Sequence, residues 1–101
     1  MSIDIEKTQI RTPDRRHHDL KGRMILFVLI QQLVHAKQTN TSITAIELFE
    51  SAWPNISTIP RNGIRRVYTE IHRLRQMGIT IETYDGGYRL QPDLRIIYTS
   101  L

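Results

Sequence analysis

The sequence has 101 residues, with 14 lysines and arginines against 10 aspartates and glutamates, which leaves a formal net charge of +4. A chain of this length fits one small domain, and its basic balance favours polyanionic partners such as nucleic acid, a membrane surface or an acidic protein. It contains no cysteine, which excludes disulfides, thiolate metal sites and cysteine nucleophiles.

The beginning of the chain, MSIDIE, carries charges where a secretory signal needs an apolar core. The longest apolar run, MILFVLI, is seven residues long, whereas crossing a bilayer takes about 20 residues. We therefore expect a soluble cytoplasmic protein with no membrane partner.

The chain divides into three expected segments. Residues 1–11 carry mixed charges without a firm period, and we interpret them as an N-terminal arm, leaving open whether it is ordered or binds DNA. Residues 12–92 are expected to form the domain. Residues 93–101 are an apolar tail that could add a last strand or contact a second copy of the chain.

A first helix is predicted over residues 12–37. The stretch Thr12-Pro13-Asp14 has the pattern of a helix start, with Thr12 as N-cap and Pro13 at the first helical position. Apolar residues within 20–34 then extend almost all the way round this helix, so it must be covered on most sides. Two interpretations stay open: its own domain covers the helix, or a second copy covers part of it.

A short second helix is expected after a polar connection. Ser42 and Ile43 could form a single rung of a strand, and Thr44 then caps the helix with Glu47 as its capping-box partner. Pro54 ends this helix because proline interrupts helical hydrogen bonding.

A third helix is expected over about residues 58–77, after a long turn at 53–60. Ser57 is one candidate for its N-cap and Asn62 is a rival start. Gly78 ends the helix, because glycine adopts the left-handed conformation that follows many helices.

A β-hairpin is predicted over residues 79–90. The stretch 79–83 alternates between apolar and polar residues, as a half-buried strand does. Asp85-Gly86 is a strong signal for a tight turn, and residues 87–90 form the return strand.

The third helix separates into two faces when about 100° is assigned to each residue. The apolar face holds Ile64, Val67, Tyr68, Ile71 and Leu74. The opposite face contains three arginines and no acid, with Glu70 off to the side; its members are Asn62, Arg65, Arg66, Thr69, Arg73 and Gln76.

The residue types on the polar face suit double-stranded DNA. The planar fork of arginine matches guanine edges and phosphate, and asparagine and glutamine can read adenine. The N-terminal half of a helix in the major groove usually approaches the bases. We expect base contacts from Asn62, Arg65, Arg66 and Thr69, adenine-type contacts also from Gln76, and phosphate contacts from Arg61, His72 and Arg73.

The hairpin strengthens this interpretation. A basic face alone is also typical of a solvated helix surface, but a hairpin directly after it is a more specific combination. Gly86 and Gly87 would allow close approach to a phosphate, with Arg89 behind them, while Asp85 serves the turn.

Other chemistry is not indicated. His17, His18, His35 and His72 lack the spacing of a metal site. Arg15-Arg16 beside the first two histidines extends a basic segment that could enter a minor groove. We find no nucleophile with a base, no paired catalytic carboxylates and no cofactor motif, so we expect no enzyme, no metal and no cofactor.

The expected order is helix, short strand, helix, turn, helix and hairpin, which is an α+β fold of the winged helix-turn-helix kind. The run Val67-x3-Ile71-x2-Leu74-Arg75-x2-Gly78-Ile79-x-Ile81-x-Thr83-x2-Gly86-Gly87-Tyr88-x-Leu90 resembles the N-terminal DNA-binding domain of the biotin repressor. The endings Ile71-His72-Arg73-Leu74-Arg75 and Gly-Gly-Tyr-Arg-Leu are also similar to effector domains of OmpR-type response regulators. The resemblance covers about residues 61–91.

The resemblance implies sequence-specific DNA binding, usually by a dimer, with the third helix in the major groove. By motif position, the DNA-facing role would fall to Arg61, Asn62, Arg65, Arg66, Thr69 and Arg73, and the wing role to residues 86–89. The turn 53–60 is longer than in the biotin repressor and closer to that of the response regulators, where it can meet RNA polymerase. We expect no second domain after residue 101, and the resemblance then suggests a small repressor or activator of the kind that phages and mobile elements carry.

Two other functions stay open. One is a winged-helix module that binds a protein, as an adaptor or inhibitor, and has no DNA target. The other is an accessory factor in DNA replication or recombination that grips DNA without regulating a promoter.

Overall fold

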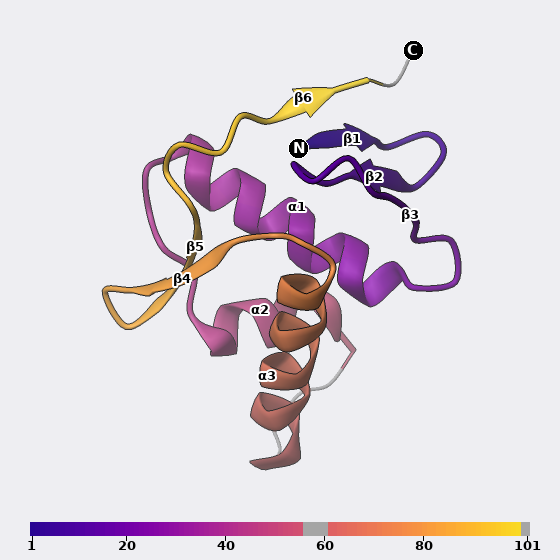
Figure 1. The fold of residues 1–101 in the computed structure, drawn as a ribbon. Coiled ribbons are helices and arrows are strands. Elements are labelled where there is room, and N and C mark those ends of the chain that lie inside the picture. Colours follow the sequence, from indigo (N-terminus) through magenta and orange to yellow (C-terminus); the bar gives the residue numbers. More distant parts are fainter. Residues whose placement is uncertain (56–60, 100–101) are drawn as a thin grey trace.

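The computed structural model describes residues 1–55 and 61–99, which form a small α+β domain with three helices and two β-sheets (Figure 1). The elements in chain order are β1 (Ser2–Asp4), β2 (Gln9–Arg11), β3 (His17–Asp19), α1 (Met24–Gln38), α2 (Ala45–Ala52), α3 (Arg61–Gln76), β4 (Ile81–Tyr84), β5 (Gly87–Leu90) and β6 (Ile97–Tyr98). The α+β class agrees with the expectation from the sequence. None of the described helices is long and apolar enough to cross a bilayer.

A four-stranded sheet covers one side of α1, with the strand order β3-β2-β1-β6 (Figure 1). Strands β1, β2 and β3 are antiparallel, and β6 runs parallel to β1. Ile3 and Ile10 lie opposite each other across β1 and β2, and both are fully buried in the core. The tail therefore adds a last strand, one of the two roles left open for it.

The start of the chain differs from the prediction. Residues 1–11, interpreted as an arm, contain two strands, and the first helix begins at Met24 rather than near Thr12. Thr12 and Pro13 instead belong to a turn in which the Arg15 N–H donates to the Thr12 carbonyl at 2.9 Å. Proline at the second position of a turn is as well suited as proline at the first position of a helix. Burial of Ile3 and Ile10 favours the turn because it returns the chain along the sheet.

Helix α1 lies at the centre of the domain and contributes many residues to the hydrophobic core. Its buried residues are Leu26, Phe27, Leu29, Ile30, Leu33, Val34 and Ala36. The four-stranded sheet lies on one side of it and the other helices lie on the opposite side (Figure 1). Of the two interpretations, burial by the same chain accounts for these residues, while Met24 at the helix start is 53% exposed.

Helix α2 has the predicted capping box. The Glu47 N–H donates to the Thr44 hydroxyl at 3.1 Å, and the Thr44 N–H donates to Glu47 Oε1 at 3.0 Å. These bonds satisfy N–H groups that a helix start otherwise leaves unpaired. Ile43, just before the cap, pairs with Tyr88 through two backbone hydrogen bonds of 2.9 and 2.8 Å, which confirms the single rung.

Helix α3 packs closely on α2. A Cβ added at Gly63 would lie 2.5 Å from Cε2 of the buried Phe49 ring, so only glycine allows this approach. The start proposed at Ser57 falls outside the described residues. The predicted end is confirmed, since Gly78 follows the helix with a φ of +101°.

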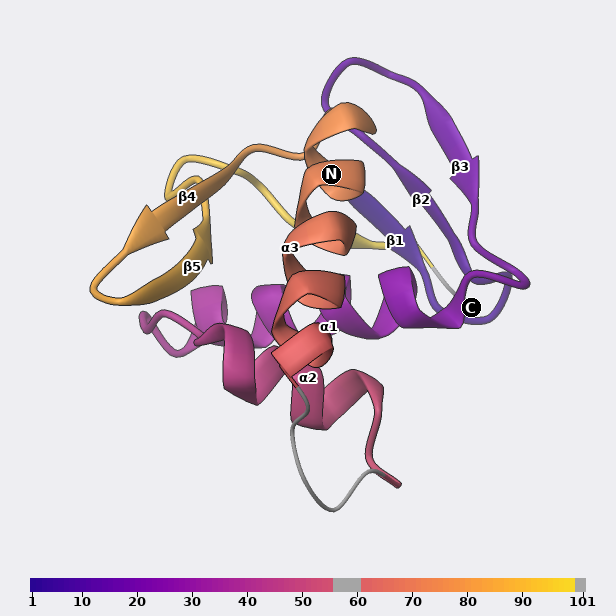
Figure 2. The same cartoon turned by 90° about the horizontal axis from the view of Figure 1, so that it is seen from below.

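The hairpin β4–β5 follows directly. Asp85 and Gly86 have φ values of +51° and +77°, the left-handed pair that a type I′ turn requires. Figure 2 shows this hairpin and the four-stranded sheet on opposite sides of α3.

Candidate nucleic-acid interface

The inner face of α3 is anchored in the core by three apolar side chains. Val67, Ile71 and Leu74 are fully buried. The helix therefore cannot rotate about its axis without exposing them, and the direction of its outer face is set by this packing.

Tyr68 departs from the predicted apolar face. It is 52% exposed and borders a hollow of about 390 Å³ between α3 and the hairpin, together with Tyr84 and Tyr88. Tyrosine suits such a border because its ring can pack while its hydroxyl stays in water. Tyr88 is less exposed, and desolvation by burial raises the pKa of its hydroxyl.

The outer face of α3 gathers most of the predicted DNA-binding residues. The exposed side chains are Asn62, Arg65, Arg66, Thr69, His72, Arg73 and Gln76. Arg61 begins the helix, but its side chain lies outside the described part of the structure. One helix face thus presents several guanidinium groups and two amides to solvent.

Most of the arginines on this face form no ion pair with the described residues. Arg73 Nη1 lies 3.1 Å from Glu70 Oε1, and within residues 1–55 and 61–99 neither Arg65 nor Arg66 takes part in an ion pair. The Thr69 hydroxyl donates to the Arg65 carbonyl at 3.0 Å. With its proton used in this way, Thr69 can act toward a ligand only as an acceptor.

The predicted wing residues have different surroundings. Gly86 is at the open tip, with nothing within 4 Å of the position a Cβ would take. Gly87 is buried, and a Cβ there would lie 2.6 Å from the Ile43 carbonyl oxygen. Close packing against Ile43 therefore explains the glycine at position 87 without any ligand.

Arg89 is engaged within the hairpin. Its guanidinium carbon lies 3.7 Å from the centre of the Tyr84 ring, and Nη2 lies 3.4 Å from Glu82 Oε2. It lines a small hollow with Lys37 near the end of α1. Arg89 and Glu82 are cross-strand partners on the hairpin face opposite Thr83 and Tyr88, so the structure does not bring Arg89 to the α3 face.

Three further polar residues make contacts at the end of α3 that were not predicted: Arg75, Arg16 and His18. Arg75 donates from Nε and Nη2 to the Ile81 carbonyl, at 3.1 and 2.8 Å, and so joins the end of α3 to β4. Its place in the last helical turn is the signal that could have indicated a helix-end contact. Arg16 and His18 contact carbonyls at the end of α3 from about 60 residues away in sequence, and no local spacing predicts this.

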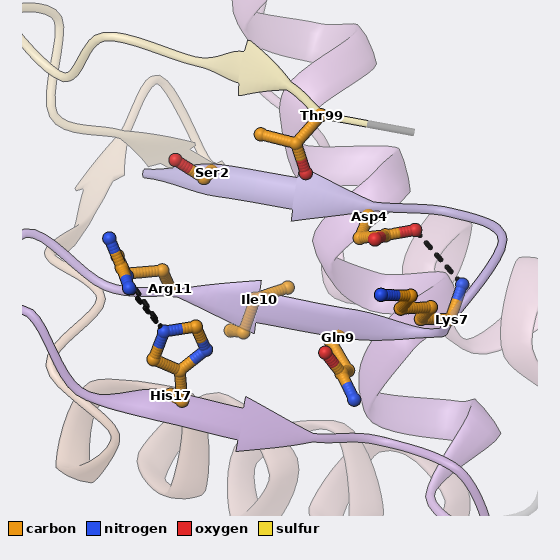
Figure 3. A pocket seen from close by; sticks show the side chains of 8 residues that line it. All are labelled: Ser2, Asp4, Lys7, Gln9, Ile10, Arg11, His17 and Thr99. Atoms are coloured by element: carbon orange, nitrogen blue, oxygen red, sulfur yellow. Dashed lines mark hydrogen bonds between the residues drawn. The ribbon is translucent and has the colours of Figure 1, made fainter. Parts of the chain in front are cut away.

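The outer face of the four-stranded sheet carries a further hollow of about 240 Å³ (Figure 3). Polar side chains such as Asp4, Gln9 and Arg11 line it, and Arg11 Nε donates to His17 Nε2 at 2.9 Å. No group of three or more His, Cys, Asp or Glu side chains suited to a metal occurs among the described residues. The arrangement offers hydrogen bonds but no reactive pair.

No family model, no curated protein and no solved structure matches this chain. Its function is therefore inferred from the geometry and chemistry of its own residues. Among the described residues, the outer face of α3 brings together seven of the residues predicted to bind DNA.

Proposed function

We propose that this chain is a sequence-specific, double-stranded-DNA-binding regulator of transcription. In this proposal the domain is a winged helix-turn-helix, α3 enters the major groove and the hairpin β4–β5 is the wing. The order of three helices followed at once by a hairpin supports it, as does the rung between Ile43 and Tyr88 that joins the hairpin to the segment before α2. The resemblance carried by residues 61–91 points to the same arrangement.

The observation that carries the proposal is the outer face of α3. Helix α3 has 16 residues and is therefore about 24 Å long, and a major groove about 12 Å wide admits one helix. Arg65 and Arg66 are exposed in its N-terminal half, where a recognition helix usually meets base edges. Glu70, the carboxylate on this helix, is turned aside, with only 15% of its side chain exposed.

The roles of individual residues follow from chemistry. Asn62, Arg65 and Arg66 would meet bases, with Thr69 as an acceptor for a base amino group. His72, Arg73 and Gln76 lie farther along the same face and would meet phosphates or a second base step. Gly86 would let the backbone of the hairpin tip approach a phosphate.

We also propose that the DNA-bound form is a homodimer. A single helix reads only a few base pairs, and two copies on adjacent half-sites extend the recognised sequence. Ile97 and Tyr98 on the edge strand β6 are 48% and 45% exposed and are candidate contacts between copies. A contact with RNA polymerase through the loop 53–60 would involve residues 56–60, which lie outside the described residues.

A protein-interaction module is the competing function, and a specific observation favours it. Ile46, Tyr68 and Tyr84 are 51%, 52% and 49% exposed, respectively, and exposed apolar side chains of this kind are typical of protein-binding surfaces. Asp85 at the hairpin tip would also repel a phosphate. A module of this kind would not require Arg65 or Arg66.

Fluorescence anisotropy with labelled duplexes separates the two functions. The probes are the region upstream of the gene and a scrambled duplex of the same composition, each titrated over a salt series. The variants are Arg65→Ala/Arg66→Ala and, as a charge-matched control on the tail and on β1–β2, Arg95→Ala/Lys7→Ala.

We expect tight binding that prefers the upstream duplex and weakens steeply with salt, because neutralised phosphates release counterions. The Arg65→Ala/Arg66→Ala variant should bind at least about 30-fold more weakly, since each paired arginine contributes about 1–3 kcal/mol of discrimination. Equal and weak binding of both duplexes by all proteins would refute a DNA target and favour a protein partner. Binding by the wild-type protein without preference for the upstream duplex would favour the accessory-factor role.

A further inference from the structure

A second group of arginines gathers at the C-terminal end of α3, away from the hairpin. A hollow of about 440 Å³ lies there, lined by Arg16, His18, Arg23, Arg73, Gln76 and Met77. The three guanidinium groups come from three separate segments: the loop after β2, the residue before α1, and α3 itself. No carboxylate lines this hollow among the described residues.

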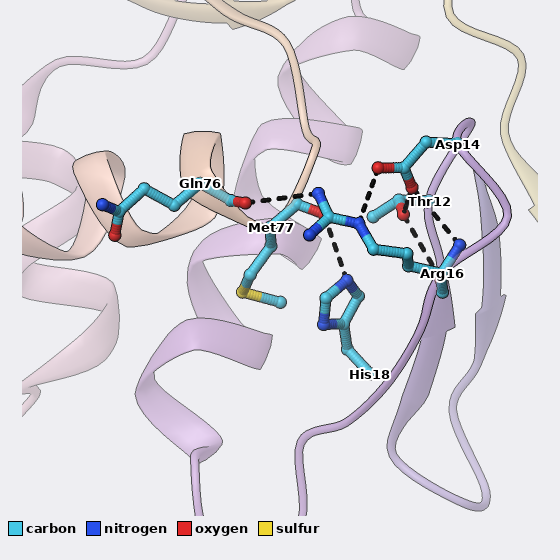
Figure 4. Close-up of polar contacts among 6 residues, drawn as sticks. All are labelled: Thr12, Asp14, Arg16, His18, Gln76 and Met77. Carbon is cyan, nitrogen blue, oxygen red and sulfur yellow. Dashed lines mark hydrogen bonds and ion pairs between the residues drawn. The ribbon is translucent and has the colours of Figure 1, made fainter.

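The loop that carries Arg16 is held against the end of the helix. Arg16 Nη2 donates to the Gln76 carbonyl at 3.3 Å, and His18 Nε2 lies 3.1 Å from the Met77 carbonyl (Figure 4). The same loop lies close to Gly78, just after α3: a Cβ added at Gly78 would lie 2.9 Å from Asp14 Oδ2. These contacts hold the Arg16 guanidinium at the end of α3 before any ligand binds.

Several N–H groups of these arginines remain for a ligand. Arg16 uses Nε for Asp14 at 2.6 Å, and Arg73 uses Nη1 for Glu70 at 3.1 Å. A guanidinium has five N–H donors, so each of these two keeps donors beyond its ion pair. Arg23 is exposed, and its side chain makes no hydrogen bond or ion pair with the described residues.

We propose that Arg23 and Arg73, with Arg16 beside them, bind a phosphate of the DNA backbone next to the groove that α3 enters. This inference rests on the proposed DNA-binding function and extends it to residues of the segment before α1. The planar forks of arginine bind phosphate oxygens in pairs, which an ammonium cannot do. Continuity supports DNA as the ligand, because Arg73 and Gln76 belong both to this hollow and to the outer face of α3.

In this arrangement the protein contacts DNA on both sides of α3. The hairpin lies on one side of α3 and the four-stranded sheet on the other (Figure 2). A phosphate contact at Arg23 would therefore fall on the flank that the hairpin does not reach, and each copy would cover more DNA than α3 and a wing alone.

The first test is the salt dependence of duplex binding by Arg23→Ala. Losing one phosphate contact should reduce the slope of log K against log salt by about 0.9 and weaken binding to upstream and scrambled duplexes alike. Arg95→Ala, which removes the same side chain from the exposed tail, should leave the slope unchanged. Arg23→Lys should recover most of the slope but not the full affinity, because it restores the charge without the fork.

The second test locates the contact directly. Titration of the ¹⁵N-labelled protein with duplex should shift the side-chain Nε–Hε resonances of Arg23 and Arg73, whereas inorganic phosphate at equal concentration should not give a saturable shift. A shift with inorganic phosphate and none with duplex would assign the hollow to a free anion and overturn the proposal.

The outcomes separate this inference from the proposed function. If wild-type binding depends on Arg65 and Arg66 while Arg23→Ala behaves like Arg95→Ala, this inference is wrong and the DNA-binding proposal stands. If the wild-type protein binds no duplex, both fail. Far-UV circular dichroism melting of each variant shows whether a loss reflects unfolding, and a folded Arg23→Ala protein with unchanged slope decides against the contact.

Discussion

Arg75 and Ile81 connect the end of α3 to the first hairpin strand. The guanidinium of Arg75 donates two hydrogen bonds, of 3.1 and 2.8 Å, to the backbone carbonyl of Ile81. Because β4 begins at Ile81, this contact helps to set the direction in which the hairpin leaves the helix. The contact therefore acts together with the rung between Ile43 and Tyr88 to position the hairpin beside α3.

Arg75→Ala should therefore loosen the hairpin. We expect the free energy of unfolding, measured by urea denaturation, to fall by about 1 kcal/mol, because the Ile81 carbonyl loses its charged donor. Arg66→Ala removes an exposed arginine from the same helix and should change stability by less than about 0.5 kcal/mol. Equal effects of the two substitutions would mean that the Arg75 bonds add nothing to the hairpin's attachment.

The two glycines of the hairpin should respond differently to alanine. Gly87→Ala places a Cβ within 2.6 Å of the backbone oxygen of Ile43, which cannot move aside as a flexible side chain could. We expect it to cost about 2–3 kcal/mol of stability and to disrupt the rung between Ile43 and Tyr88. Gly86→Ala meets open space and should cost only about 1–2 kcal/mol for its left-handed backbone.

Thermal melting, with the amide exchange rate of Tyr88 as a local probe, compares the two variants. Faster exchange of the Tyr88 amide in Gly87→Ala alone would identify the packing role. If Gly86→Ala were instead the less stable variant, the left-handed turn at Gly86 would matter more for stability than the close contact between Gly87 and Ile43.

The first strands should be essential for stability. Ile10 is 1% exposed in the core, so Ile10→Ala should lower the free energy of unfolding by about 2–5 kcal/mol. Ile5, in the connection between β1 and β2, is 47% exposed, and Ile5→Ala is the matched control with an expected change below about 0.5 kcal/mol. If chemical denaturation finds both variants as stable as the wild-type protein, residues 1–11 behave as the arm expected from the sequence.

The capping box should make stability depend on pH through Glu47. Hydrogen bonds from the Thr44 N–H and then from the Thr44 hydroxyl hold the pKa of Glu47 below its ordinary value of 4.5. A carboxylate with a lowered pKa in the folded state contributes stability above its ordinary pKa, and this is lost as the pH falls through the folded value.

Glu47→Gln should therefore be less stable than the wild-type protein at pH 7, and the gap should narrow toward pH 3. Urea denaturation across this range measures it, and Glu50→Gln, which removes an exposed carboxylate from the same helix, is the control. A gap that stays constant with pH would contradict a role for the ionised carboxylate in the cap.

Features decided by a few neighbouring residues were predictable. The capping box of Thr44 and Glu47, the Asp85-Gly86 turn and the end of α3 at Gly78 each depend on local hydrogen bonds and backbone conformation. The polar face of α3 was predictable for a similar reason, since helical periodicity alone separates Arg65 and Arg66 from the buried Val67.

The sequence by itself therefore determined the α+β class, the second helix, the hairpin and the outer face of α3. Only the tertiary structure decided that Thr12-Pro13 makes a turn rather than a helix start, because the choice depends on burying Ile3 and Ile10 beside a helix formed later in the chain. It likewise decided that Arg16 reaches the end of α3, 60 residues away in sequence. Such contacts join residues distant in sequence, and their energies depend on packing that no local pattern records.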